Sequence, residues 1–343
     1  MKDILGVCII AAILSWFLTR FLRWYAISRS VMDIPNARSS HTEPTPRGGG
    51  MAIIIVFLTC LAVLFYMSRL DVYLFVALTG AGLGVAIIGF MDDHGHIAAR
   101  WRLLTHFSSA GWLLFWLGGL PPLLLFGSYF DLGWFGHLMA LVVLVWLLNL
   151  YNFMDGIDGI AGIEALSSSL VVGLFFLFLL NNEEVASLHL LMSASVAGFL
   201  VWNFPPAKIF MGDAGSGFLG LMLGGLALYS AHIVPQMLWV WLIMLGVFIV
   251  DSSYTLLRRL LRGDKVYEAH RSHAYQYASR KYAGHRPVTL AVLIINLLWL
   301  APWSFFVASD SVDGVLGLVV AYLPLLWLVW YLRAGELEDK EDV

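Results

Sequence analysis

Six aspartates of this chain stand beside long apolar runs rather than in polar segments. Glycines adjoin three of them, so the backbone there can turn tightly and let a ligand approach closely. Carboxylates gathered at the edge of an apolar phase repel one another and are costly to desolvate, and a hard cation relieves both effects. Magnesium prefers one or two carboxylates together with water and the oxygens of a substrate phosphate. The acids therefore predict a site for Mg²⁺, for which Mn²⁺ can substitute, and a diphosphate. The six are Asp92, Asp93, Asp155, Asp158, Asp213 and Asp251.

Two motifs carry three of these acids. Residues 149–159 read Asn-Leu-Tyr-Asn-Phe-Met-Asp-Gly-Ile-Asp-Gly and contain no basic residue, and residues 210–217 read Phe-Met-Gly-Asp-Ala-Gly-Ser-Gly. The second motif opens an apolar run, so the N-terminus of a helix, which attracts anions, is expected beside Asp213. One acidic loop by itself is most often a solvated loop. The whole set on one membrane face favours a site.

Basic residues that could hold a phosphate occur in two other segments. Residues 258–287 form the largest polar loop, with eight Lys or Arg and three His, and within it His270-Arg271-Ser272-His273 spaces two imidazoles at i and i+3. Arg binds phosphate through paired hydrogen bonds and His can donate to it, so anion binding is the favoured interpretation. Contact with anionic lipid is one alternative, and a zinc site without an evident third ligand is another. The second segment, 40–50, is rich in Pro and Gly and contains Arg47.

Membrane helices must position these residues. The 343 residues are 60% hydrophobic and 13% charged, whereas soluble domains carry about a quarter charged residues. A membrane helix needs about 20 apolar residues. We therefore predict an all-α, polytopic integral membrane protein in which residues 1–343 form one domain with about eleven transmembrane helices. The expected spans are 4–22, 51–67, 72–90, 103–118, 135–151, 160–180, 188–204, 216–232, 237–257, 288–308 and 314–332.

The basic residues orient this bundle. An odd number of spans puts the termini on opposite sides, and a periplasmic N-terminus with a cytoplasmic C-terminus leaves only Lys2 and Arg69 of the 20 Lys and Arg outside. Cytoplasmic loops carry such an excess. The six aspartates then lie at or near the cytoplasmic surface, and the outside acids, such as Asp131 and Asp313, are expected to be ordinary solvated ends. The acidic tail 336–343 is expected to be a solvated end as well.

Taken in order, these motifs resemble the polyprenyl-phosphate N-acetylhexosamine-1-phosphate transferase family, glycosyltransferase family 4, over nearly the whole chain. The resemblance rests on Pro44-Thr-Pro-Arg-Gly-Gly-Gly, the Asp92-Asp93 pair, residues 149–159 and 210–216, and the His-x-x-His loop. Within the family, His270-Arg-Ser-His-Ala-Tyr-Gln resembles the branch that initiates bacterial O-antigen chains (WbpL type). It differs from the three-histidine run of the phospho-MurNAc-pentapeptide translocase and from the His-Ile-His form of the enterobacterial GlcNAc-1-phosphate transferase.

The resemblance implies an activity and a role for each site residue. The enzyme would sit in the bacterial inner membrane with its site facing the cytoplasm, and would transfer a sugar 1-phosphate from a UDP-N-acetylhexosamine to undecaprenyl phosphate, leaving UMP. The donor would be UDP-N-acetylfucosamine or UDP-N-acetylglucosamine, and the product would start O-antigen or a related cell-surface polysaccharide. Asp92, Asp93, Asp155 and Asp158 would be catalytic, and Asp158 and Asp213 would hold the metal. The residues implied for substrate binding are Arg47, Asn152, Asp251, His270, Arg271 and His273.

Two other functions stay open. One is the pentapeptide translocase of the same family, and the other is a secondary transporter with eleven helices. Transporters place ionisable groups near the middle of the bilayer on broken helices, whereas here most of the acids stand at the boundary and only Asp251 lies clearly inside an expected span. No feature indicates a nucleic acid. The oligomeric state stays open, with a homodimer as one arrangement.

Overall fold

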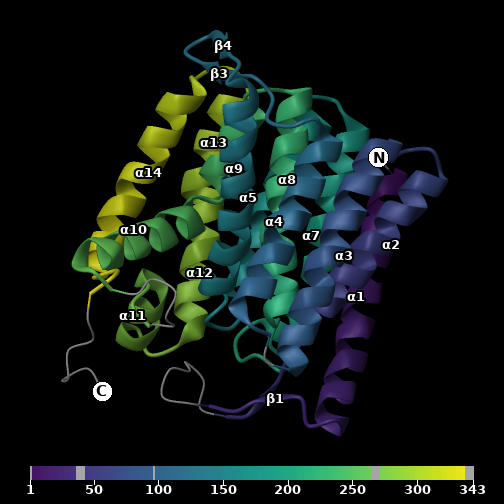
Figure 1. Ribbon diagram of the computed structural model, residues 1–343, viewed down its shortest axis with the longest axis vertical. Helices are drawn as coiled ribbons and strands as arrows, with labels where there is room; N and C mark the ends of the chain where they lie inside the picture. The colour runs from purple at the N-terminus through teal and green to yellow at the C-terminus, as the bar shows by residue number, and fades with distance from the viewer. Residues whose placement is uncertain (1, 36–42, 96, 265–270, 337–343) are drawn as a thin grey trace.

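The computed structural model describes residues 2–35, 43–95, 97–264 and 271–336 as a bundle of long helices (Figure 1). The α-helical prediction is confirmed, since every expected span coincides with helix. Two short antiparallel pairs of strands join β1 (Met32–Asp33) to β2 (Thr45–Pro46) and β3 (Leu123–Leu125) to β4 (Ser128–Phe130). A π-helical turn at Phe175–Leu179 follows α6, and another at Asn296–Leu300 joins α12 to α13. The helices are α1 (Lys2–Ser28), α2 (Met51–Tyr66), α3 (Val72–His94), α4 (Ala99–Leu117), α5 (Gly133–Met154), α6 (Ile160–Leu174), α7 (Glu183–Asn203), α8 (Asp213–Ile233), α9 (Met237–Met244), α10 (Gly246–Arg262), α11 (Ala274–Lys281), α12 (His285–Ile295), α13 (Ala301–Ala308) and α14 (Gly314–Tyr331).

The length and composition of the helices define a polytopic membrane protein. In the described part of the chain, eight helices are long and apolar enough to cross a membrane, and the bent pair α9–α10 raises the number to nine. The two remaining expected spans are also helical, but α2 has only 16 residues and α4 carries Arg100 and Arg102 in its first turn. The count of eleven therefore stays a prediction.

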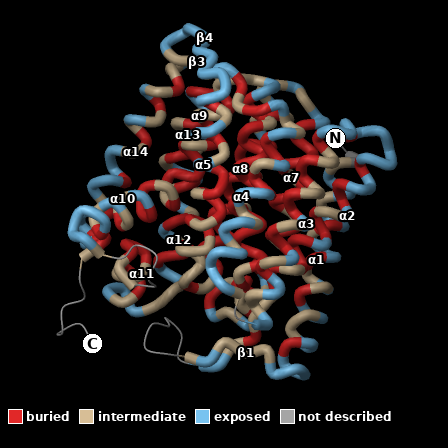
Figure 2. Tube along the Cα trace, viewed as in Figure 1, coloured by how far each residue is buried: buried red, intermediate tan, exposed pale blue. Residues whose placement is uncertain are grey.

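Helix α8 lies at the centre of the bundle, where Figure 2 shows the buried core. It packs chiefly against α3 and α5 and is the most deeply buried of the long helices. Small residues let helix backbones approach closely in a membrane. At Gly220 a Cβ atom would lie 2.5 Å from the carbonyl oxygen of Leu147 in α5, so only glycine permits this contact. The core therefore fixes the start of α8, which carries Asp213, against its neighbours.

The expected span 237–257 is not one straight helix. It breaks at Leu245, which leaves the helical conformation, and α9 and α10 meet at 67°. The predicted span is therefore helical but bent, because the apolar content of a segment does not specify the direction of its helix. The second half carries arginines in its last turn and leaves the axis of the bundle, as Figure 1 shows at the left of the view. This bend determines the position of Asp251, which lies in the second turn of α10.

Candidate active site

The described site residues come from helix ends and adjoining loops at the end of the bundle opposite the β3–β4 hairpin (Figure 1). The Pro/Gly-rich segment before α2 pairs with the segment before α8: the Phe210 N–H donates to the Pro46 carbonyl at 2.8 Å, and the Gly49 N–H donates to the Phe210 carbonyl at 2.9 Å. These bonds carry Arg47 across to the start of α8. Two motifs separated by about 160 residues are thereby joined into one surface.

An ion-pair network forms the centre of this surface. Arg47 binds Asp93 through Nε at 2.9 Å and Asp213 through Nη2 at 2.7 Å. Arg102, from the first turn of α4, binds Asp92 through Nη1 at 2.5 Å and lies 3.7 Å from Asp213. The side chain of Asp213 is 29% exposed, whereas that of Asp93 is 2% exposed. Asp213 is therefore an accessible carboxylate between two guanidinium groups that can also bind phosphate.

Asp93 acts mainly on the start of α8. Its Oδ1 accepts the backbone N–H of Asp213 at 3.0 Å, and its Oδ2 accepts that of Ala214 at 3.3 Å. Gly212 precedes them at φ +82°, a conformation that favours glycine. A carboxylate at a helix N-terminus satisfies free N–H groups and complements the helix dipole. Asp93 thus fixes the orientation of Asp213, and its direct part in catalysis stays a prediction.

Asp155 ends α5 beside this network. In the described part of the chain its carboxylate has no hydrogen bond or ion pair. Burial raises the pKa of Asp155 well above its ordinary value, and the charges of Asp213, Asp93 and Asp158 add to this against the opposing effect of Arg47. One turn earlier, the Asn152 amide donates to Ser216 of α8 at 3.2 Å. An unpaired carboxylate facing three others is a position that a cation would stabilise.

Asp158 already has protein partners for both carboxylate oxygens. Oδ1 lies 3.0 Å from Nδ1 of His285, and Oδ2 accepts the Ala207 N–H at 2.9 Å. The hydroxyl of Thr289 donates to the Asp158 carbonyl at 2.8 Å. His285 and Thr289 lie in the first turns of α12, so Asp158 ties the loop between α5 and α6 to the segment that follows the long polar loop. In this arrangement Asp158 is the less available metal ligand.

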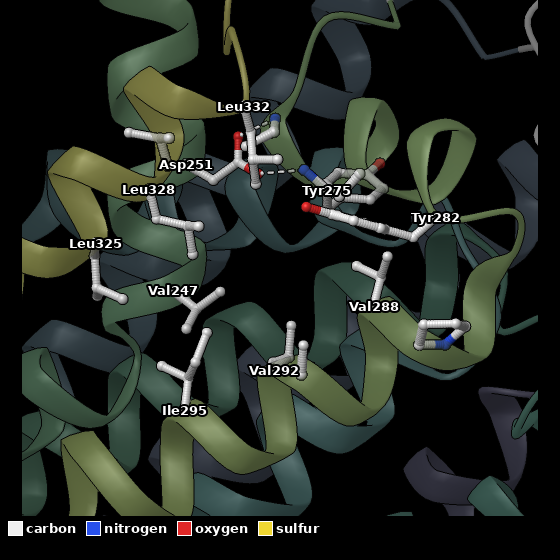
Figure 3. Close-up of a pocket in the computed structure, with 15 residues that line it drawn as sticks. Val247, Asp251, Tyr275, Tyr282, Val288, Val292, Ile295, Leu325, Leu328 and Leu332 are labelled. Atoms are coloured by element: carbon white, nitrogen blue, oxygen red, sulfur yellow. Dashed lines mark hydrogen bonds between the residues drawn. The ribbon is translucent and has the colours of Figure 1, made fainter.

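Asp251 binds His273 and the first residues of α11 through its carboxylate. Its side chain is 4% exposed, and it accepts hydrogen bonds from the backbone N–H groups of Ala274 and Tyr275, both at 3.0 Å, while its Oδ1 lies 3.1 Å from Nδ1 of His273. Figure 3 shows this carboxylate with its bonds to the start of α11. These contacts make Asp251 a positioning residue for His273. Its predicted contact with substrate is not needed to explain its burial.

The rest of the predicted phosphate-binding segment lies next to His273. Arg271 is half-buried and its carbonyl accepts the guanidinium of Arg280 at 3.4 Å. His270 lies outside the described residues. The Tyr275 hydroxyl donates to the Phe153 carbonyl at 2.9 Å, two residues before Asp155. This bond connects the His273 region to the acidic cluster.

Two cavities open beside these groups. One, of about 280 Å³, lies between α3, α4, α5 and α8, with apolar walls such as Val85 and Leu148 and a polar end formed by Asp92, Arg102 and Asp213. The other, of about 310 Å³, is almost wholly apolar and lies between α10, α11, α12 and α14 (Figure 3). The first cavity brings an apolar slot to the accessible carboxylate. An amphiphile with an anionic head matches such a slot.

The donor set suits a magnesium ion that also takes substrate oxygens. No group of three or more Asp, Glu, His or Cys side chains in the described residues is arranged to hold a metal by itself. Mg²⁺ does not require such a group, because it uses one or two carboxylates with water and phosphate oxygens. Asp213 is accessible, and Asp155 has no partner in the part of the chain that the structure describes, so these two side chains fit the ion.

The site also contains three residues that the sequence motifs did not indicate. Arg102 pairs with Asp92, His285 with Asp158, and Tyr275 with the loop before Asp155. The sequence could have indicated Arg102 and His285, since each is a charged or titratable residue at the start of a helix on the same face as the acids. It could not have indicated Tyr275, whose hydroxyl acts across 122 positions in the chain.

The fold and this end of the bundle define a polytopic membrane protein with an acidic, arginine-paired site at the end of an apolar cavity. Comparison with known proteins relates the chain to membrane-lipid sugar-phosphate transferases by name. Residues 74–231 match the model of glycosyl transferase family 4. The chain is 30% identical to the decaprenyl-phosphate N-acetylglucosaminephosphotransferase of Mycolicibacterium smegmatis over 95% of its own length and 89% of that protein's.

Two further relatives carry related names. The chain is 29% identical to the probable undecaprenyl-phosphate N-acetylglucosaminyl 1-phosphate transferase of Bacillus subtilis, with 82% of this chain and 79% of the relative covered. It is 28% identical to the phospho-N-acetylmuramoyl-pentapeptide-transferase of Shouchella clausii, with 72% and 78% covered. The chain belongs to glycosyl transferase family 4.

Proposed function

We propose that this protein transfers an N-acetylhexosamine 1-phosphate from a UDP-sugar to undecaprenyl phosphate, with release of UMP. The names of the relatives support the lipid phosphate and the sugar phosphate. The observation that carries the proposal is the cavity whose apolar walls end at Arg102 and Asp213, because it suits a lipid with a phosphate head. Lipid and water-soluble substrates can meet only where such a cavity reaches the surface.

The reaction is a phosphoryl transfer between two phosphates. An oxygen of the lipid phosphate attacks the phosphorus that carries the sugar, and the bond from that phosphorus to the bridging oxygen breaks. The electron pair of this bond leaves with UMP. A phosphate monoester has a second pKa of about 6, so the nucleophile is already largely dianionic near neutral pH and needs no strong base. Positioning and charge stabilisation therefore do most of the work.

The chain's own residues supply that positioning. Arg102 and Arg47 would bind the phosphates in place of Asp213, the carboxylate that both arginines approach. Asp93 and Asp92 would keep their own bonds to these arginines, and Asp93 would also hold the start of α8. His273, Arg271 and His270 would hold the donor diphosphate or sugar. Asn152 would support the nucleotide.

We assign Mg²⁺ to Asp213 and Asp155. Asp158 was expected from the resemblance, but its oxygens bind His285 and Ala207, whereas the Asp155 carboxylate has no partner among the described residues. When bound, the ion supplies positive charge to the diphosphate and to the leaving UMP. A bound ion would also relieve the repulsion between these carboxylates.

The site should face the cytoplasm of a bacterial inner membrane, where UDP-sugars are made. The distribution of Lys and Arg supports this orientation. A cysteine placed at Ser272 should react with a membrane-impermeant reagent only in inverted vesicles, and one at Asn182 only in intact spheroplasts. The background for both should lack Cys8 and Cys60. Reaction of both positions from one side would contradict the orientation.

The proposed donor and pathway are supported by the resemblance of the His-x-x-His form to the branch that initiates O-antigen chains. We propose UDP-N-acetylfucosamine or UDP-N-acetylglucosamine as the donor and the start of O-antigen or a related surface polysaccharide as the role. The rival is the pentapeptide translocase reaction, favoured by the Shouchella clausii relative but not by a loop that lacks the three-histidine run. UMP release by purified protein from a panel of UDP-sugars, with undecaprenyl phosphate and Mg²⁺, tests both. No UMP from any donor would reject the proposed function.

A further inference from the structure

A glutamate is buried inside the apolar bundle, away from the acidic cluster. Glu164 lies in the second turn of α6 and is 0% exposed. Its Oε2 accepts the amide of Asn296 at 2.7 Å, and the same amide lies 2.8 Å from the Ser167 hydroxyl. An acid in a membrane span is costly, and such residues normally have a function. The transferase site does not use this one.

Glu164 lies beside the break between α9 and α10. The backbone N–H of Phe248, in the first turn of α10, lies close to this carboxylate without forming a hydrogen bond of ordinary geometry. Its Oε1 has no hydrogen-bond partner of good geometry in the described residues. The N–H groups of a first helical turn have no partner within their helix and carry positive partial charge, so a carboxyl group there is stabilising.

The other side of the break is satisfied from the same face of α6. Ser168, one turn after Glu164, donates its hydroxyl to the Met244 carbonyl at 3.1 Å, at the end of α9. Residues at i and i+4 share one face of a helix. From α14, the Tyr322 hydroxyl donates to the Leu242 carbonyl at 2.6 Å. A break in a membrane helix is tolerated where neighbouring side chains satisfy the freed backbone groups in this way.

The bend is connected to the site by α10. Five residues after its start, α10 carries Asp251, whose carboxylate binds His273 and the first N–H groups of α11. The direction of α10 therefore sets where His273 stands, and Tyr275 of the same segment reaches the Phe153 carbonyl. A helix that pivots at Leu245 would move all of these contacts together.

We propose that Glu164 and Ser168 form a latch that fixes the bend between α9 and α10 and so positions Asp251 and His273 at the site. The inference rests on the proposed function only for its activity readout. Both latch residues are positioning residues, since neither touches the reacting groups. The latch also explains why an acid is kept near the start of an apolar helix.

Three variants test the latch. Glu164→Leu removes the acceptor at similar volume, Glu164→Gln keeps an acceptor and the bond from Asn296, and Ser169→Ala is a matched control, because Ser169 is buried in the same helix and its hydroxyl has no partner in the described residues. Glu164→Leu should lower kcat roughly 10- to 100-fold, since a misplacement of about 1 Å costs on that order. The KM for the UDP-sugar should change less than kcat. The other two variants should behave like the wild type.

The direction of α10 is measured separately. Spin labels at Leu261, at the exposed end of α10, and at Trp134, at the exposed start of α5, report the bend as a distance distribution in protein lacking Cys8 and Cys60. Glu164→Leu should shift or broaden this distribution, and Glu164→Gln and Ser169→Ala should not.

An unchanged distribution in Glu164→Leu, or a changed one with normal turnover, would overturn the latch. If Glu164→Leu does not fold, Ser168→Ala applies the same criteria with a smaller effect, about threefold in kcat for one lost hydrogen bond. A wild-type protein that releases no UMP would refute the proposed function and leave the distance test valid.

Discussion

The two ends of the bundle use aspartate in opposite ways. At the end with the β3–β4 hairpin, three aspartates accept backbone N–H groups: Asp71 caps α3, Asp131 accepts the Gly133 N–H, and Asp313 caps α14 and also accepts the Phe126 N–H of the hairpin. At the other end, acids from α3, α5 and α8 converge on one another and on arginines from elsewhere in the chain. A local cap stabilises folding, whereas convergent carboxylates repel, so the second arrangement indicates binding.

Metal removal should separate the two ends most sharply. A chelator should abolish UMP release, because Asp155 and Asp213 would lose the cation that shields them, and added Mg²⁺ should restore it. Thermal unfolding in detergent should change little, since the caps at the opposite end involve no metal. The measurement is UMP release with EDTA and after readdition of Mg²⁺ or Mn²⁺. Full activity in the chelator would contradict a catalytic metal.

Replacement of the accessible carboxylate should have the next largest effect. Asp213→Asn keeps the shape but removes the charge that pairs with Arg47, so kcat should fall by roughly 10³-fold, the scale seen when one electrostatic group of a site is lost. The matched control is Asp131→Asn at the opposite end, which should leave turnover unchanged. The measurements are steady-state UMP release, which compares the turnover of the two variants, and size-exclusion profiles, which show whether both are folded. Equal turnover in the two variants would remove the distinction between the ends.

A smaller loss is expected where the acid supports the site without facing it. Asp251→Asn turns a carboxylate with four hydrogen-bond partners, Thr255, His273, Ala274 and Tyr275, into a mixed donor and acceptor. His273 should then be held less firmly, and kcat should fall about 10- to 100-fold. Ser252→Ala is the control, because Ser252 is buried next to it and its hydroxyl has no partner in the described residues. Comparison of kcat and KM for the UDP-sugar gives the answer. A change in KM alone would instead support the prediction from the sequence that Asp251 contacts the substrate.

The smallest effect belongs to a cap at the opposite end. Asp313→Ala removes the acceptor for two N–H groups of α14 and for Phe126, so the free energy of unfolding should fall by about 1 kcal/mol. Turnover at a temperature well below the midpoint should not change. Thermal melts in detergent and UMP release from the same preparation measure both quantities. A catalytic defect in a folded Asp313→Ala protein would show that the two ends are coupled.

Much of the candidate site could be predicted because the types of its residues indicate which ligands they can bind. Aspartates with adjoining glycines at the edges of apolar runs indicated a cation and a phosphate before any contact was known. The positions of Asp93, Asp158 and Asp251 in that site could not be predicted. Each contacts a backbone N–H or a histidine from a distant segment, and the spacing of residues in the sequence does not indicate such contacts.

The sequence by itself determined the class of fold, because runs of about 20 apolar residues can satisfy their backbone in a membrane only as helices. It also determined which end of the bundle carries the acids. The tertiary structure alone decided the bend at Leu245, the pairing of Arg102 with Asp92, and the burial of Glu164 beside α10. The physical reason is that hydropathy records how apolar a segment is. The direction of a helix and the partner of a buried charge depend on side chains that meet only after the chain has packed.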